Sequence, residues 1–164
     1  MNQLIVKQTA ILSAILGGIL GVLTLIPFVR NFSFMLLILC ISAVIIVYMK
    51  KNDLIGIIDV KEGAILGAII GFVSFIAFSI VFMPLVMLVS AILGAFHIHY
   101  NTYGINIFIQ TGFFVLIMLV IFIGILSALM NAFAGLVTAY LYEVLTGVRK
   151  EDKQEENVDF EIKE

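Results

Sequence analysis

The chain has 164 residues, of which 63% are apolar and 12% charged, and its formal net charge is −2. A soluble domain is about half apolar and one quarter charged, so this composition excludes a soluble globular protein and indicates an integral membrane protein. The small net charge and the scattered basic residues also offer no basic surface for nucleic acid.

Charged residues divide the sequence into four apolar blocks, which are Gln8–Val29, Asn31–Met49, Gly63–Phe96 and Ile105–Tyr142. These blocks are too long and too uniform for the alternating strands of about 10 residues that build membrane barrels, so we expect an all-α helical bundle. The first block lacks a signal-peptidase motif and approaches the ~20 residues of a spanning helix, so we expect it to be retained.

The first two blocks predict one membrane span each, with Pro27 ending the first helix and a short connection over residues 27–31. The last two blocks are longer than one crossing, because helices of this length reach on the order of 50 Å against a hydrocarbon core of about 30 Å. We favour four spans, with residues 84–112 forming an interfacial or re-entrant segment after Pro84. Six spans are the alternative.

Basic residues are distributed unequally between the two sides of such a bundle. Arg30 alone lies on one side, and the other side carries Lys7, Lys50, Lys51, Lys61, Arg149, Lys150, Lys153 and Lys163. By the positive-inside rule, both termini are expected in the cytoplasm of a protein of the cell membrane. We therefore predict a transmembrane domain over residues 1–148 and a charged, disordered cytoplasmic tail over residues 149–164.

The first and third blocks resemble each other. Residues 13–28, SAILGGILGVLTLIPF, align without gaps to residues 63–78, GAILGAIIGFVSFIAF, with eight of sixteen positions identical. This match favours two tandem helical hairpins, a parallel repeat of the kind that some transporters contain. Chance similarity within the small alphabet of membrane helices is the alternative reading.

Small residues recur at intervals of four inside these blocks. The residues concerned are Gly17 and Gly21 in the first block, Gly63, Gly67 and Gly71 in the third, and Ala128 and Ala132 in the last. A phosphate-binding loop would need glycines between a strand and a helix followed by a lysine, so this spacing instead predicts faces on which helices pack closely. The partner could be another helix of the chain or a second copy.

None of the four apolar blocks contains Asp, Glu, Lys, Arg or His. Their absence argues against a proton relay, a voltage sensor, an ion-coupled carrier and an intramembrane hydrolase. We therefore expect no enzyme, cofactor or metal. Asn131, which lies among small residues, is predicted to act as an interhelical polar clasp, with a ligand contact as the alternative.

The remaining candidate groups have ordinary interpretations. His97 and His99 would share a face only in an extended segment and have no third ligand nearby, so they read as interfacial histidines and not as a metal site. Cys40 is the single cysteine, which excludes an internal disulfide and favours a small apolar role.

Two stretches carry a resemblance to known proteins. LTLIPFVRN with the following apolar hairpin, and VKEGAILGAIIGFVSF, resemble a loose class of small, uncharacterised bacterial membrane proteins with four predicted spans. The resemblance covers residues 13–78 and implies an architecture but no activity. In its apolar character and small-residue first helix, the chain is also similar to the six-span substrate-binding components of energy-coupling-factor vitamin transporters.

These observations lead to two functional expectations. The first is a non-enzymatic subunit or scaffold in the lipid bilayer that associates with itself or with a membrane protein partner through the face of Gly63, Gly67 and Gly71. The alternative is a membrane component of a transporter that binds an uncharged or amphiphilic small molecule near Asn131.

Overall fold

The computed structural model describes residues 3–52, 54–56, 58–95 and 113–161, and every regular element in these ranges is an α-helix. The helices are α1 (Gln3–Leu23), α2 (Pro27–Leu39), α3 (Ile41–Lys51), α4 (Val60–Ala95) and α6 (Phe113–Glu161). The predicted all-α class is therefore confirmed. His97 and His99 lie outside the described residues.

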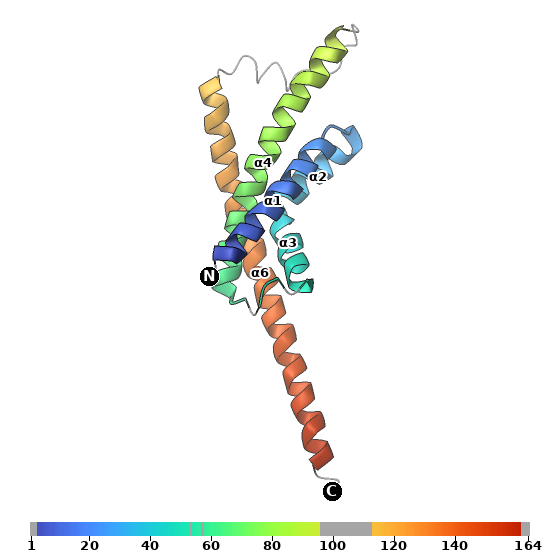
Figure 1. Ribbon diagram of the computed structural model, residues 1–164, viewed down its shortest axis with the longest axis vertical. Coiled ribbons are helices and arrows are strands. Elements are labelled where there is room, and N and C mark those ends of the chain that lie inside the picture. Colours follow the sequence, from blue (N-terminus) through green and yellow to red (C-terminus); the bar gives the residue numbers. More distant parts are fainter. Residues whose placement is uncertain (1–2, 53, 57, 96–112, 162–164) are drawn as a thin grey trace.

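The helices pass up and down a narrow bundle (Figure 1). α1 and α4 run in one direction, whereas α2, α3 and α6 run in the other, and α4 packs against both α1 and α6. Lys7, Lys50, Lys51 and Lys61 lie toward one end of the bundle, which we call the charged end. The α1–α2 turn lies at the opposite end, where α4 and α6 diverge (Figure 1).

The described helices include three that are long and apolar enough to cross a membrane, namely α1, residues Val60–Ile92 of α4 and residues Phe114–Leu145 of α6. α2 and α3 form a pair bent by 70°, and the number becomes four if this pair counts as one broken span. Apolar helices compatible with a multi-pass membrane protein are thus present, and the count of four spans remains a prediction.

Pro27 begins α2 and does not end α1, contrary to our prediction, and residues 27–31 are helical. α1 ends earlier, at Leu23, and the chain turns over the next three residues. Proline fits the first position of a helix because the N–H that it lacks has no intrahelical acceptor there.

The second predicted span is broken at Cys40, where α2 ends and α3 begins. No proline or glycine stands at this position, so the local sequence gives no signal for the break. Cys40 itself is exposed.

α4 continues through Pro84 to Ala95, so residues 84–95 do not turn back as the re-entrant segment that we predicted would. Membrane helices tolerate proline where neighbouring groups and small adjustments satisfy the freed carbonyl. The rest of that predicted segment, residues 96–112, lies outside the described residues.

α6 extends to Glu161, although we predicted a disordered tail from residue 149. Residues 149–161 contain no proline or glycine and are rich in Glu, Lys, Gln and Arg, all of which have high helix propensity. A long apolar helix that is already nucleated can therefore continue into them at little cost.

Most side chains of the buried core come from α2, α3 and α4, among them Leu37, Ile41, Ile45, Ile70 and Phe75, and α1 adds Leu20. α6 instead exposes a long apolar surface, in which Phe114 is 82% and Phe133 is 68% accessible. Such a face suits a helix surrounded by hydrocarbon, since lipid tails are as apolar as the side chains themselves.

Candidate functional site

The glycines of α4 face α6. A Cβ atom at Gly67 would overlap the carbonyl oxygen of Asn131, and a Cβ at Gly71 would come within 2.6 Å of the Ser127 carbonyl oxygen and 3.0 Å of the Ala128 Cα. The two backbones therefore touch directly, as expected where glycines recur every four residues.

The contact extends toward the charged end and is antiparallel. A Cβ at Gly63 would lie 2.5 Å from the Ala139 Cβ, and one at Gly67 would lie 3.0 Å from the Ala132 Cα. Ser127 Oγ also donates a hydrogen bond to the Gly71 carbonyl, at 3.1 Å. The face of Gly63, Gly67 and Gly71 is thus covered by α6 of the same chain.

The glycines of α1 face α4 in a similar way. A Cβ at Gly17 would overlap the Ser74 backbone, and one at Gly21 would lie 3.1 Å from the Phe78 carbonyl oxygen. Although Gly17 and Gly67 occupy equivalent positions in the sequence repeat, they pack on different helices, α4 and α6. α4 is therefore held by backbone contacts on two faces.

Asn131 lies opposite the break between α2 and α3 and is fully buried. Its side-chain oxygen accepts a hydrogen bond from the Ser42 backbone N–H at 3.0 Å. Its amide nitrogen donates to the carbonyls of Ile38 at 2.9 Å and Leu37 at 3.1 Å. These are backbone groups at the adjoining ends of two helices, where intrahelical partners are missing.

Two further hydrogen bonds complete this arrangement. Ser42 Oγ donates to the Asn131 backbone carbonyl at 2.8 Å, and the Asn131 amide nitrogen also reaches the Ser127 carbonyl at 3.0 Å. The Asn131 side chain therefore forms hydrogen bonds with backbone groups on both sides of the break. The hydrogen-bonding capacity of the Asn131 amide is directed to the protein's own backbone.

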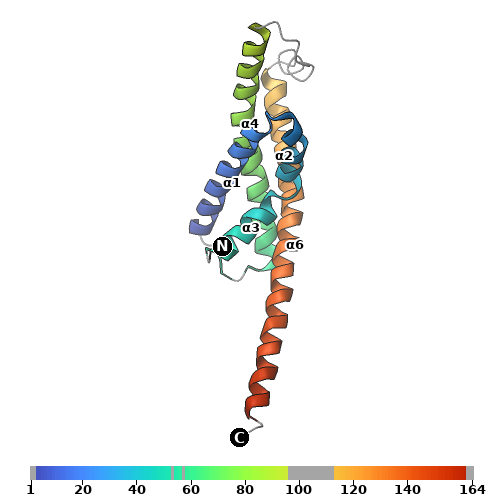
Figure 2. The same cartoon turned by 90° about the vertical axis from the view of Figure 1, so that its right-hand side faces the viewer.

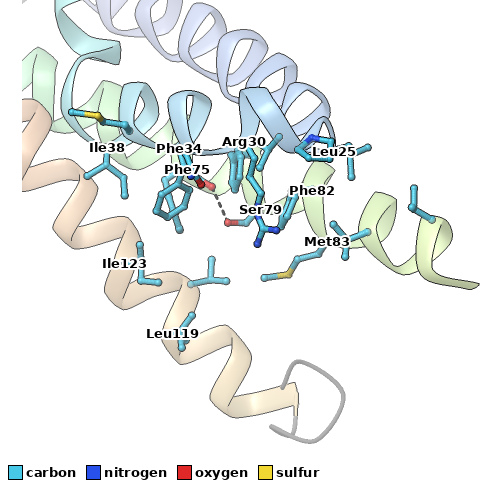
Figure 3. A pocket seen from close by; sticks show the side chains of 18 of the residues that line it. Leu25, Arg30, Phe34, Ile38, Phe75, Ser79, Phe82, Met83, Leu119 and Ile123 are labelled. Atoms are coloured by element: carbon cyan, nitrogen blue, oxygen red, sulfur yellow. Dashed lines mark hydrogen bonds between the residues drawn. The ribbon is translucent and has the colours of Figure 1, made fainter. Parts of the chain in front are cut away.

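A pocket of about 800 Å³ lies between α2, α4 and α6 on the side of the break away from the charged end (Figure 3). We call it the α2/α4/α6 pocket. Its lining comprises Thr24, Leu25, Pro27, Arg30, Asn31, Phe34, Met35, Ile38, Leu39, Phe75, Phe78, Ser79, Phe82, Met83, Val86, Val89, Ser90, Leu119, Val120 and Ile123. It forms where α4 and α6 diverge, so that α2 covers a gap that their side chains do not fill.

Four aromatic rings build one wall of the pocket. Phe78 is central, with ring centroids 5.1 Å from Phe82, 6.1 Å from Phe75 and 6.2 Å from Phe34, the last in an edge-on arrangement. These separations lie within the range in which aromatic pairs attract each other. The wall is therefore a packed and apolar surface joining α2 to α4.

Each hydroxyl group of the pocket donates to the backbone carbonyl four residues earlier in the chain. Thr24 Oγ1 donates to the Leu20 carbonyl at 2.7 Å, Ser79 Oγ to Phe75 at 2.9 Å and Ser90 Oγ to Val86 at 2.7 Å. Each hydroxyl has a single proton, so none of these groups is left with a donor for a ligand.

Arg30 and Asn31 are the other polar residues of the lining, and both belong to the first turns of α2. Figure 3 shows the Arg30 side chain directed into the pocket, on the side of Ser79 and Phe82. Within the described ranges neither side chain makes a hydrogen bond or ion pair, so the pocket combines apolar walls with free N–H donors.

Sequence reasoning did not identify this pocket. From the sequence, Arg30 was noted only as the single basic residue on its side of the predicted bundle, and Ser79 and Ser90 were not predicted to belong to a site. The signal that was available is the position of Arg30, because one arginine flanked by apolar blocks is unusual unless it has a partner.

Comparison with known proteins found no matching family model, no similar curated protein and no similar solved structure. The site is therefore interpreted from its own residues.

Proposed function

We propose that the protein is a non-enzymatic, multi-pass membrane protein that binds one amphiphilic small molecule in the α2/α4/α6 pocket. The observation that carries the proposal is the pocket itself, with about 800 Å³ of space, aromatic and aliphatic walls and a charged group near the start of α2. Small-molecule sites are typically about 300–1,000 Å³, mostly apolar and provided with a few polar groups.

The geometry gives less support to a scaffold that associates through the glycine face of α4. Gly63, Gly67 and Gly71 contact α6, so a partner could reach them only if the two helices separated. The exposed apolar face of α6 is the surface left for lipid, for a second copy or for a membrane protein partner.

Asn131 is also a weaker candidate for a ligand contact than the pocket residues. Its amide is engaged with Ser42, Leu37 and Ile38, and a ligand would have to replace these bonds. Among the described residues that line the pocket there is no carboxylate, imidazole or thiol, which is why we propose binding, as in a transport component, and not catalysis.

For the orientation, we propose that the charged end faces the cytoplasm. Lys7, Lys50, Lys51 and Lys61 belong to that end, and Arg30 belongs to the other. The positive-inside rule then puts both termini in the cytoplasm and the pocket in the half of the bilayer away from it.

The natural chain has no tryptophan, so one introduced indole reports its own surroundings. Phe82→Trp puts this reporter in the pocket wall, and Phe133→Trp puts a matched reporter on the exposed face of α6. We would titrate the purified protein in detergent with a brominated long-chain alcohol, which quenches nearby indoles. We expect saturable quenching at a low mole fraction for Phe82→Trp, and quenching that only follows the bulk mole fraction for Phe133→Trp.

The second comparison uses a variant in which a larger side chain fills the pocket. Val120→Phe, added to the Phe82→Trp protein, should abolish saturable quenching because Val120 lines the pocket. Ile121→Phe on the neighbouring exposed position should leave it unchanged. Identical titrations of the two reporters, or no effect of Val120→Phe, would contradict the proposed function.

A further inference from the structure

Resting on the proposed function, we propose that the amphiphile bound in the α2/α4/α6 pocket is anionic, a single-chain molecule whose charged head is held by Arg30. The pocket would receive the apolar chain along the wall of Phe75, Phe78 and Phe82, with the head at the first turn of α2.

Within the described part of the chain, no carboxylate lies at the Arg30 end of the bundle. Every acidic residue of the sequence falls either within residues 53–62 or within residues 143–164. Among the described acidic residues, Asp59 and Glu62 lie at or just before the start of α4, and those from Glu143 to Glu161 lie in the last part of α6, at or beyond the charged end (Figure 1). Of the carboxylates that the structure describes, none is therefore placed to neutralise the positive charge beside the pocket.

The position of Arg30 in α2 is also unfavourable for the helix alone. Arg30 is the fourth residue of α2, close to the N-terminus, where the helix dipole is positive and a cation is destabilising. The N-cap residue Ile26 provides no side-chain hydrogen bond that would offset this effect. An anion at this point would be attracted both by the guanidinium and by the helix N-terminus.

The hydrogen-bond donors of the pocket also favour an anionic head group. The hydroxyls of Thr24, Ser79 and Ser90 donate to backbone carbonyls, which leaves Arg30 and Asn31 as the residues with N–H groups to offer. A guanidinium presents paired donors that match a carboxylate or phosphate, and its strength increases where water is scarce. A head group that only donates hydrogen bonds would find no such match here.

Arg30 could alternatively extend to the phosphates of the bulk bilayer, as long basic side chains near helix ends commonly do. A titration distinguishes the two cases, because contact between Arg30 and the bulk phosphates is not saturable and does not depend on the pocket. In Figure 3 the side chain is directed into the pocket and not away from it.

The test compares two brominated quenchers with the same chain, a long-chain carboxylate and the corresponding alcohol. Both are titrated into the Phe82→Trp protein at alkaline pH, where the carboxylate is ionised. We expect the carboxylate to bind about tenfold more tightly or better, which is the effect of one charge-assisted hydrogen bond. Arg30→Gln should reduce carboxylate binding to the level of the alcohol, and Arg30→Lys should retain part of the preference.

Lys7→Gln is the matched control, since it removes one positive charge at the charged end without touching the pocket. It should leave the preference unchanged. Equal binding of acid and alcohol to the unaltered Arg30 protein would overturn the anionic assignment while leaving the proposed function standing. A preference that survives Arg30→Gln would overturn the role of Arg30. If neither compound quenches saturably, the proposed function itself fails.

Discussion

The Asn131 side-chain oxygen accepts the backbone N–H of Ser42 at 3.0 Å, and the Ser42 hydroxyl returns a hydrogen bond to the Asn131 carbonyl at 2.8 Å. This reciprocal pair joins residues 89 positions apart in the sequence. It holds α6 to the first turn of α3 just beyond the break at Cys40. A backbone N–H without an intrahelical partner is costly in hydrocarbon, so the pair makes the break tolerable inside a membrane.

Replacing Asn131 should therefore destabilise the protein more than an ordinary interhelical hydrogen bond would suggest. Asn131→Leu keeps the number of side-chain heavy atoms and their branching but leaves the Ser42 N–H and the carbonyls of Leu37 and Ile38 without this partner. Because each orphaned buried group costs about 1–3 kcal/mol, we expect a loss of about 2–4 kcal/mol after relaxation. Denaturant unfolding in mixed micelles would measure it. Leu129→Ala, on the exposed face of α6, should change stability by less than about 0.5 kcal/mol.

An added methyl group should distinguish the glycines that contact a backbone from those that do not. Gly67→Ala would push a Cβ into the Asn131 carbonyl, which cannot move aside as a side chain could, so we expect a loss of about 1–3 kcal/mol or more. At Gly18 the nearest atom is a Val81 methyl carbon at 3.6 Å, so Gly18→Ala should be neutral or slightly stabilising. Thermal unfolding in detergent gives the comparison, and equal midpoints for the two variants would contradict this view of the α4–α6 contact.

The sequence predicts those parts of the structure that follow from local pattern. Apolar blocks indicate the helices, and a small residue at every fourth position marks a face of α4 that has no side chains to keep a neighbour away. The faces of Gly67 on α4 and Gly17 on α1 could therefore be predicted, but the partner of each face depends on how the helices are arranged. Likewise, the role of Pro27 was predicted incorrectly because proline suits the first turn of a helix as well as a turn between helices.

The break at Cys40 and the pocket could not be predicted in the same way. No proline or glycine stands at the break, and Asn131 of α6 accepts the backbone N–H that the break leaves unpaired. The pocket exists because α4 and α6 touch at their glycines and then diverge, leaving Arg30 of α2 beside the space between them. Both features depend on contacts between residues far apart in sequence, which a local pattern does not contain.

The proposed orientation predicts opposite labelling at two exposed positions. Phe28 lies in the first turn of α2 and is 97% accessible, whereas Leu54 lies in the connection between α3 and α4 and is 38% accessible. In a Cys40→Ala background, Phe28→Cys should react with a membrane-impermeant maleimide added to intact cells. Leu54→Cys should react only after permeabilisation, because the proposed orientation puts the charged end in the cytoplasm. The reverse pattern would invert the topology, and labelling of both sites in intact cells would show that the α2–α3 pair does not cross the membrane.

Truncating the centre of the aromatic wall should affect both stability and binding. Phe78 is 4% exposed and contacts the rings of Phe34, Phe75 and Phe82, so Phe78→Ala should cost about 3–5 kcal/mol through lost packing and a residual cavity. Phe28→Ala removes the same ring from an exposed position and should cost less than about 0.5 kcal/mol.

The cavity left by Phe78→Ala adjoins the α2/α4/α6 pocket, so the variant should also accept a bulkier apolar chain than the natural protein does. Comparing branched and unbranched brominated alcohols with the Phe82→Trp reporter, in protein that remains folded, tests this. Unchanged selectivity would mean that the wall of Phe78 does not contact the bound chain.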